Sequence, residues 1–130
     1  MISLNTNRFG ALEVDEQKII HFPDGIIGFP ALKRYVLLDY KDTDVKWLQC
    51  VDDPDIAFIV APPRKFFKDF AVQVDSVTRA ALSLKDDADL ALLVILRVEN
   101  GEVIANLEGP LAINSRLMTG IQTVAETSTS

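Results

Sequence analysis

Cysteine and histidine are almost absent from this sequence, which holds one of each among its 130 residues. A lone cysteine, Cys50, forms no internal disulfide and no cysteine-based zinc cluster, and it suits a reducing compartment. Nucleophilic catalysis usually needs a base beside the nucleophile, and His21 is the one histidine available. Both residues lie in strand-like segments, where a half-exposed histidine and a small buried thiol are the ordinary roles. The sequence therefore predicts no catalytic residues and no enzyme.

Long hydrophobic runs are also missing. The longest strictly apolar run, residues 90–96, is far shorter than the ~20 residues that a membrane helix needs. The first six residues have neither the basic region nor the apolar region of a secretory signal. We therefore expect a cytoplasmic protein that does not associate with membranes.

Basic residues are outnumbered, with 13 lysines and arginines against 19 acidic residues and a net charge of −6. Proteins that bind nucleic acid owe much of their affinity to lysine and arginine side chains that displace counterions from phosphates. The charge balance therefore predicts no direct binding to nucleic acid. Basic proteins are the partners that it favours.

Apolar residues are abundant, at 48% of the chain, and they come in short bursts divided by turn residues. This pattern indicates a mainly β fold. Strand patterns, some of them weak, fall at residues 9–14, 18–22, 34–40, 46–51, 56–61, 71–75, 89–98, 102–107, 111–114, 116–118 and 121–124. We expect about nine strands in a β-barrel-like or strongly curled antiparallel sheet, since closure removes exposed edges.

Two hairpins are expected within this sheet. The first joins residues 9–14 to 18–22 around Asp15-Glu16-Gln17. The second joins residues 89–98 to 102–107 through Asn100-Gly101, the pair that type I′ turns favour.

One short helix is expected near residues 76–84, with Ser76 as its N-cap. Its apolar face would consist of Val77, Ala80, Ala81 and Leu84. The whole chain then forms a single domain over residues 1–125, and residues 126–130 form a flexible tail because they lack an apolar anchor.

Acidic residues gather in three short clusters. These are Asp42 with Asp44, Asp52-Asp53-Pro54-Asp55, and Asp86-Asp87-Ala88-Asp89. Calcium takes oxygen ligands from such loops, but none of the three has the ligand spacing, central glycine and terminal glutamate of an EF-hand. We therefore expect no metal and no cofactor. The clusters are either solvated loops at strand ends or docking surfaces for a basic protein.

Two further segments carry weak signals for nucleic acid. Gly25-Ile26-Ile27-Gly28 has the Gly-x-x-Gly form of an RNA-clamping loop, but its central residues are isoleucines and no basic charge adjoins them. Pro23-Asp24-Gly25 and Gly28-Phe29-Pro30 instead predict a structured loop. Arg64-Lys65-Phe66-Phe67-Lys68 interleaves basic and aromatic residues, as single-strand binders do. A capped turn with its phenylalanines in the core, or a protein-docking patch, explains that segment as well.

Three segments carry motifs that are specific in combination. The first, residues 22–29, has the sequence FPDGIIGF and contains a Gly-x-x-Gly-Phe loop. The second, residues 47–58, has the sequence WLQCVDDPDIAF, a Trp-Leu-Gln block that runs to an Ala-Phe strand. The third, residues 106–114, has the sequence NLEGPLAIN, an Asn-Leu-x-x-Pro block that ends in Ile-Asn. In this order and at these intervals, the chain resembles the FliW flagellar assembly factor family over roughly residues 8–124.

The resemblance implies a small β-barrel-like protein that binds flagellin in the cytoplasm, as a chaperone-like partner, and the translational repressor CsrA. Factor released when flagellin is exported would bind CsrA and lift the repression of flagellin translation. We expect the free protein to be a monomer. Two alternatives stay open: an acidic β-barrel module with another protein partner, and a nucleic-acid-binding barrel.

Candidate partner-binding residues are side chains in the matched loops that have no evident role in the core. They are Asp24, Asp52, Asp53, Asp55 and Asn114. Phe29 and Trp47 are added because large aromatic side chains anchor interfaces, although they also fill cores.

Overall fold

A computed structural model describes residues 1–39, 43–63, 74–107 and 109–123 of the chain. The fold is mainly β, as predicted. The strands are β1 (Ile2–Thr6), β2 (Gly10–Val14), β3 (Ile20–His21), β4 (Arg34–Asp39), β5 (Lys46–Cys50), β6 (Ala57–Ala61), β7 (Leu90–Glu99), β8 (Glu102–Ala105), β9 (Leu111–Asn114) and β10 (Thr119–Gln122). The described residues also form one α-helix, α1 (Ser76–Ala81), and the short 3-10 turns η1 (Glu16–Lys18) and η3 (Asp87–Asp89).

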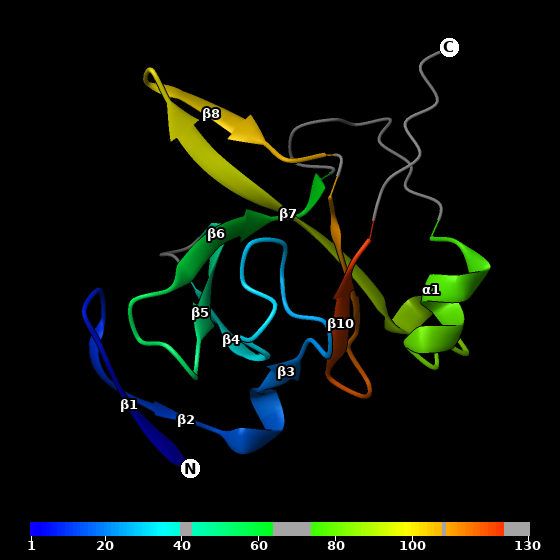
Figure 1. The fold of residues 1–130 in the computed structure, drawn as a ribbon, viewed down its shortest axis with the longest axis horizontal. Helices are drawn as coiled ribbons and strands as arrows, with labels where there is room; N and C mark the ends of the chain where they lie inside the picture. The colour runs from blue at the N-terminus through cyan, green and yellow to red at the C-terminus, as the bar shows by residue number, and fades with distance from the viewer. Residues whose placement is uncertain (40–42, 64–73, 108, 124–130) are drawn as a thin grey trace.

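Eight strands form one sheet that closes on itself (Figure 1). Their order is β6-β5-β4-β3-β10-β9-β7-β8, and a further pairing of β6 with β7 completes a ring. The long strand β7 makes this closure possible, because it pairs with β9 over Leu90–Leu93, with β6 over Val94–Leu96 and with β8 over Leu96–Glu99. The predicted closure of a curled, largely antiparallel sheet is therefore confirmed, with β3 and β10 as a parallel pair.

The interior of the ring holds the main hydrophobic core, and a second apolar layer lies outside it. In β6, Phe58 and Val60 belong to the main core, whereas Ile59 and Ala61 pack on the outer cluster with Val94 and Leu96. Neighbouring residues of a strand point to opposite faces, so a strand that is covered on both faces has no polar alternation. This explains the unbroken apolar run at the start of β7.

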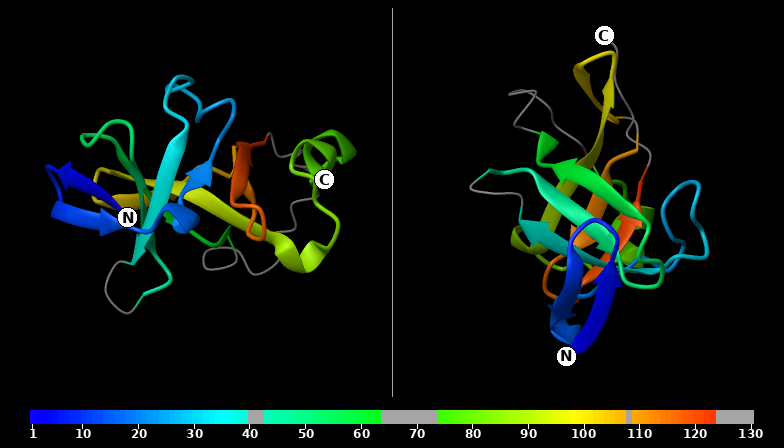
Figure 2. Two further views of the ribbon diagram at one scale, coloured as in Figure 1. Left: turned by 90° about the horizontal axis from the view of Figure 1, so that it is seen from below. Right: turned by 90° about the vertical axis from the view of Figure 1, so that its left-hand side faces the viewer.

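The hairpin predicted around Asp15-Glu16-Gln17 is wrong. Residues 15–18 form an Asp15 N-cap followed by η1, and β2 pairs with β1 instead. The β1–β2 hairpin is a separate two-stranded sheet at the end of the molecule opposite α1 (Figures 1 and 2). Val14 and the neighbouring Ile19 pack on Val36 and Val51, on the outside of the ring. Local spacing missed this pairing because β1 carries two buried residues, Leu4 and Thr6, of which one is polar.

The second predicted hairpin is confirmed. β7 and β8 pair from Glu99–Glu102 outward, and Asn100 and Gly101 both have the positive φ, 53° and 79°, that a type I′ turn requires. This hairpin extends beyond the ring (Figure 1).

Other predicted strands fare differently. The strands expected at 34–40, 46–51, 56–61 and 111–114 correspond to β4, β5, β6 and β9. The strand expected at 116–118 is wrong, because these residues form the turn between β9 and β10, with Met118 at a φ of 56°. Most of the strand expected at 71–75, the segment 64–68 and the tail 126–130 lie outside the described residues.

The predicted helix is confirmed, but its cap and its buried face differ. Asp75, not Ser76, is the N-cap, and its carboxylate accepts a 2.7 Å bond from the Thr78 backbone N–H. That bond holds the pKa of Asp75 below its ordinary value. The expected apolar face is wrong: Val77 is 76% exposed, and Thr78 and Leu82 are the buried residues. Because α1 has six residues, its orientation depends more on the buried residues that it packs against than on a short apolar pattern.

Candidate protein-docking site

The acidic turn, residues 52–55, connects β5 to β6 and carries three of the predicted residues. Cys50 N–H donates to the Ile56 carbonyl at 2.9 Å, and Ile56 N–H donates to the Asp53 carbonyl at 3.2 Å. The Asp53 carboxylate accepts a 3.0 Å bond from the Asp55 backbone N–H. These bonds close the loop locally and give it a fixed shape.

The side chain of Gln49 fixes the acidic turn by hydrogen bonds. This residue received no role in the sequence analysis. Its side chain is fully buried, and Nε2 donates to the carbonyls of Cys50, Pro54 and Ile56 at 3.0, 3.2 and 3.2 Å. A buried amide with such partners substitutes for backbone pairing that the turn lacks. A glutamine between the apolar residues Leu48 and Cys50 was the available signal in the sequence.

The three carboxylates of the acidic turn are not equivalent. Asp52 accepts bonds from Arg34 Nε and Nη2 at 2.8 and 2.5 Å, and this pairing lowers the pKa of the Asp52 carboxyl. Its charge is therefore largely balanced within the chain. Asp55 accepts a bond from the neutral Asn7 amide. Among the described residues, the Asp53 carboxylate accepts a bond from the Asp55 backbone N–H and pairs with no cation. The uncompensated negative charge of the turn thus rests on Asp53 and Asp55.

The glycine loop, residues 25–28, carries Asp24 and Phe29 on its flanks. Gly25 has a φ of +68°, and a Cβ there would lie 2.4 Å from the Phe29 carbonyl oxygen. The loop therefore folds back on itself in a way that only glycine permits. Phe29 is half-buried and meets Phe58 edge to face, with 5.7 Å between ring centroids, whereas Asp24 is exposed. The structured loop predicted here is confirmed.

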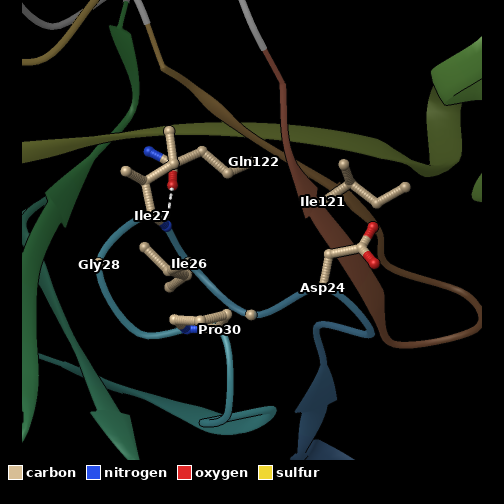
Figure 3. Close-up of a pocket in the computed structure, with 8 residues that line it drawn as sticks. Asp24, Ile26, Ile27, Gly28, Pro30, Ile121 and Gln122 are labelled. Carbon is tan, nitrogen blue, oxygen red and sulfur yellow. Dashed lines mark hydrogen bonds between the residues drawn. The ribbon is translucent and has the colours of Figure 1, made fainter.

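A pocket of about 300 Å³ opens on this loop (Figure 3). Its described lining consists of Asp24, Gly25, Ile26, Ile27, Gly28, Pro30, Ile121 and Gln122. Gln122 of β10 ties the loop to the ring, because its Oε1 accepts a 2.7 Å bond from the Ile27 N–H and its Nε2 donates to the Gly109 carbonyl at 2.9 Å. Sequence reasoning gave Ile27, Ile121 and Gln122 no role.

Trp47 lies away from this pocket, on β5 beneath the β1–β2 hairpin. Phe9 meets its ring edge to face with 5.5 Å between centroids, and the Arg8 guanidinium lies 4.5 Å from the ring centroid. The indole therefore anchors the tip of the hairpin. It remains half-buried, so part of it is still accessible to a partner.

The expectation that Asn114 lies in a loop without a core role is wrong. Asn114 ends β9 and is fully buried. Its Nδ2 donates to the Leu82 carbonyl at 2.9 Å, and its Oδ1 accepts from the N–H groups of Arg116 and Leu117 at 3.0 and 3.2 Å. The side chain thus fastens the end of α1 to the β9–β10 turn and is not available to a partner in this conformation.

The titratable groups show no catalytic arrangement in the part of the chain that the structure describes. Cys50 is buried, and burial raises the pKa of its thiol, which disfavours the nucleophilic thiolate. His21 is exposed on β3. Within the described ranges, no group of three or more His, Cys, Asp or Glu residues is placed to hold a metal ion. The described helices also include none that is long and apolar enough to cross a bilayer.

Comparison with known proteins identifies the family of this chain. A family model described as FliW protein matches residues 3–130 of the chain. The chain belongs to the FliW family.

Relatives along the full domain agree with this assignment. The flagellar assembly factor FliW of Caldanaerobacter subterraneus subsp. tengcongensis is 34% identical over 129 residues, which are 96% of this chain and 86% of that protein. The FliW of Alkaliphilus metalliredigens is 37% identical over 123 residues, or 92% of this chain and 76% of that protein. A crystal structure of a flagellar assembly factor FliW has a TM-score of 0.91 and 32% identity, covering 98% of this chain and 91% of that chain.

The three sequence blocks that resemble the FliW family have separable structural roles. The first forms the glycine loop, the second forms β5, the acidic turn and the start of β6, and the third leads into β9. Gly25, Gln49 and Asn114 in these blocks are required by the backbone geometry or by buried hydrogen bonds. Four aspartates in the blocks contribute little to the core: the exposed Asp24, Asp52 and Asp55 and the partly exposed Asp53. They remain the predicted docking residues of this FliW fold.

Proposed function

We propose that this protein is a cytoplasmic flagellar assembly factor that binds flagellin and the translational repressor CsrA. The observation that carries the proposal is the match over residues 3–130 to a family whose relatives are named flagellar assembly factors. The flagellin-bound and CsrA-bound forms of the protein would be alternative states of one cycle. Factor freed by flagellin export binds CsrA and relieves the repression of flagellin translation.

Charge supports the CsrA branch of this cycle. A repressor that binds RNA needs a basic surface, because phosphate contacts supply much of RNA-binding affinity. This protein carries a net charge of −6 and presents an acidic turn with a fixed shape. A bound acidic protein attracts the basic repressor and sets up a potential that repels the phosphates of the messenger.

Within the acidic turn, Asp53 and Asp55 supply the attraction. Asp52 is engaged by Arg34, and its replacement would release a cation that itself opposes a basic partner. Flagellin binding should depend less on this turn, because an amphipathic flagellin helix would seek an apolar groove rather than a charge.

Binding of the purified proteins tests the proposal. Calorimetric titrations of the full chain with CsrA and with flagellin should each give a saturable interaction. A gel shift with a CsrA–RNA complex should then show RNA released by this protein, and RNA retained when excess flagellin is present. Absence of binding to both proteins would refute the proposal, and release of RNA through direct binding to the RNA would favour the nucleic-acid alternative.

The role of the acidic turn has its own test. Replacing Asp53 and Asp55 with Asn keeps size and polarity, removes two charges and leaves the Arg34–Asp52 pair intact. The control replaces Glu13 and Glu102 with Gln, which removes two exposed charges elsewhere. If the turn docks at the rim of the interface, only the first variant should associate more slowly with CsrA and show a weaker salt dependence. Equal behaviour of the two folded variants would rule out the turn as the CsrA site.

A further inference from the structure

The pocket at the glycine loop has an unusual combination of a rigid frame and an exposed apolar side chain. Ile27 is 73% exposed, whereas its neighbour Ile26 is 2% exposed and belongs to the main core. Single exposed apolar residues are common on surfaces. Ile27 differs because its own backbone is held in place and because it forms one wall of a pocket.

The backbone around the pocket is already fixed by hydrogen bonds in the unbound protein. The Ile27 N–H is bonded to Gln122 Oε1, and Gln122 Nε2 is bonded to the Gly109 carbonyl. Gly25 permits the loop to turn back against Phe29 and Pro30 with no room for a Cβ. A site that is already ordered loses little conformational entropy on binding, which favours affinity for a small contact area.

The chemistry of the lining selects one class of side chain. Asp24 is the only charged residue among the eight described residues of the lining, and the other side chains are mostly apolar. Figure 3 shows the Asp24 carboxylate beside Ile121, and Ile27 beside Gln122. Among the described residues, Asp24 forms no ion pair, in contrast to the paired Asp39, Asp52 and Asp87.

Lysine and arginine side chains match this arrangement. Each lays an apolar stem along a hydrophobic surface and keeps a cationic head at a polar rim. In this pocket the stem would pack between Ile27 and Ile121, and the head would reach Asp24. A volume of about 300 Å³ is at the lower end of the range for ligand sites and suits one or two side chains.

We propose that this pocket docks a protein segment that presents a lysine or arginine next to an aliphatic residue. The aliphatic neighbour contacts the exposed Ile27, and the cation pairs with Asp24. The site is distinct from the acidic turn, because none of residues 52–55 is among the described lining residues of the pocket.

Short peptides test the recognition without knowledge of the natural partner. Three acetylated and amidated peptides, Gly-Ser-Leu-Lys-Ser-Gly and its Leu-Gln and Ser-Lys counterparts, are titrated into the ¹⁵N-labelled full chain. The Leu-Lys peptide should shift the amide resonances of Ile27 and Ile121. It should bind about threefold more tightly than either counterpart, as expected for an exposed ion pair and one small apolar contact.

Matched variants assign the effect to the two proposed residues. Asp24→Asn should remove the preference for lysine over glutamine, and Ile27→Ala should remove the preference for leucine over serine. The controls are Glu13→Gln, an exposed charge on β2, and Val77→Ala, a side chain as exposed as Ile27. Neither control should alter binding.

Three outcomes would overturn the proposal. Equal binding of the three peptides would show that the pocket has no such preference. Shifts confined to the acidic turn would place the cation there. A dimer detected by sedimentation and abolished by Ile27→Ala would make a second copy of this chain the occupant.

Discussion

Gly25 and Gly28 differ at the residue scale, although both have positive φ. A Cβ at Gly28 would meet nothing within 4 Å, whereas a Cβ at Gly25 would meet the Phe29 carbonyl at 2.4 Å and the Pro30 Cα at 2.7 Å. The left-handed backbone alone costs a non-glycine residue about 1–2 kcal/mol. Overpacking against a backbone that cannot move adds about 1–3 kcal/mol.

We therefore expect Gly28→Ala to lower the free energy of unfolding by about 1–2 kcal/mol and Gly25→Ala to lower it by about 2–5 kcal/mol. Urea denaturation of both variants beside the wild type measures the difference. Equal losses would show that the loop can open to accommodate a Cβ at Gly25.

The pairing of Asp52 with Arg34 makes a pH-dependent contribution to stability. The bond from Arg34 lowers the pKa of Asp52 in the folded protein below its unfolded value of about 3.9. The stabilisation is therefore fully present above the unfolded pKa and is lost as the pH falls through the folded pKa. Because both side chains are partly exposed, at 42% and 30%, the pair should contribute only about 0.2–1 kcal/mol near pH 7.

A double-mutant cycle isolates this contribution. Arg34→Gln, Asp52→Asn and the double variant, unfolded with urea at a series of pH values, give the coupling free energy between the two side chains. We expect the coupling to be constant from neutral pH down to about pH 5 and to fall below about pH 4. A coupling that persists unchanged in strong acid would contradict the ion-pair interpretation.

At the scale of elements, the acidic turn depends on Gln49 rather than on its own aspartates. The Gln49 amide donates to the carbonyls of Cys50, Pro54 and Ile56, of which the Ile56 carbonyl also accepts a bond from the Cys50 N–H. A buried carbonyl that loses its donor costs about 1–3 kcal/mol.

Gln49→Met keeps the length of the side chain but removes its donors. We expect it to lower the free energy of unfolding by about 1–3 kcal/mol and to speed hydrogen exchange at the Asp55 and Ile56 amides more than in β4. Gln17→Met, on the exposed turn η1, is the control and should change neither quantity. Uniformly faster exchange throughout the sheet would indicate global destabilisation without a specific role in the turn.

At the scale of the whole molecule, the closed ring and the net charge both favour binding to proteins over binding to RNA. Closure of seven of the strands through the β6–β7 and β7–β9 pairings removes free edges from the ring, and the β7–β8 hairpin projects from it. Negative charge of −6 over such a surface opposes the counterion release on which RNA binding depends.

The purified protein alone should therefore fail to retard a CsrA target RNA in a gel shift at physiological salt. The same RNA with CsrA present is the positive control. Retardation at micromolar or lower protein concentration, lost at high salt, would overturn the charge argument.

The sequence by itself determined the β class, the β7–β8 hairpin and the structured glycine loop. Each depends on neighbouring residues: strand-length apolar bursts, the Asn100-Gly101 turn and glycines at positive φ. The acidic balance and the family resemblance are likewise properties of composition and order along the chain.

Only the tertiary structure decided the pairing of β1 with β2, the buried face of α1 and the roles of Gln49 and Asn114. These features depend on contacts between distant segments. Asn114 is needed in the core because it meets Leu82, 32 residues earlier, and the pocket exists because Gln122 meets Ile27, 95 residues earlier. Local sequence patterns do not reveal such contacts, because closure of the ring decides which distant residue each polar group bonds to.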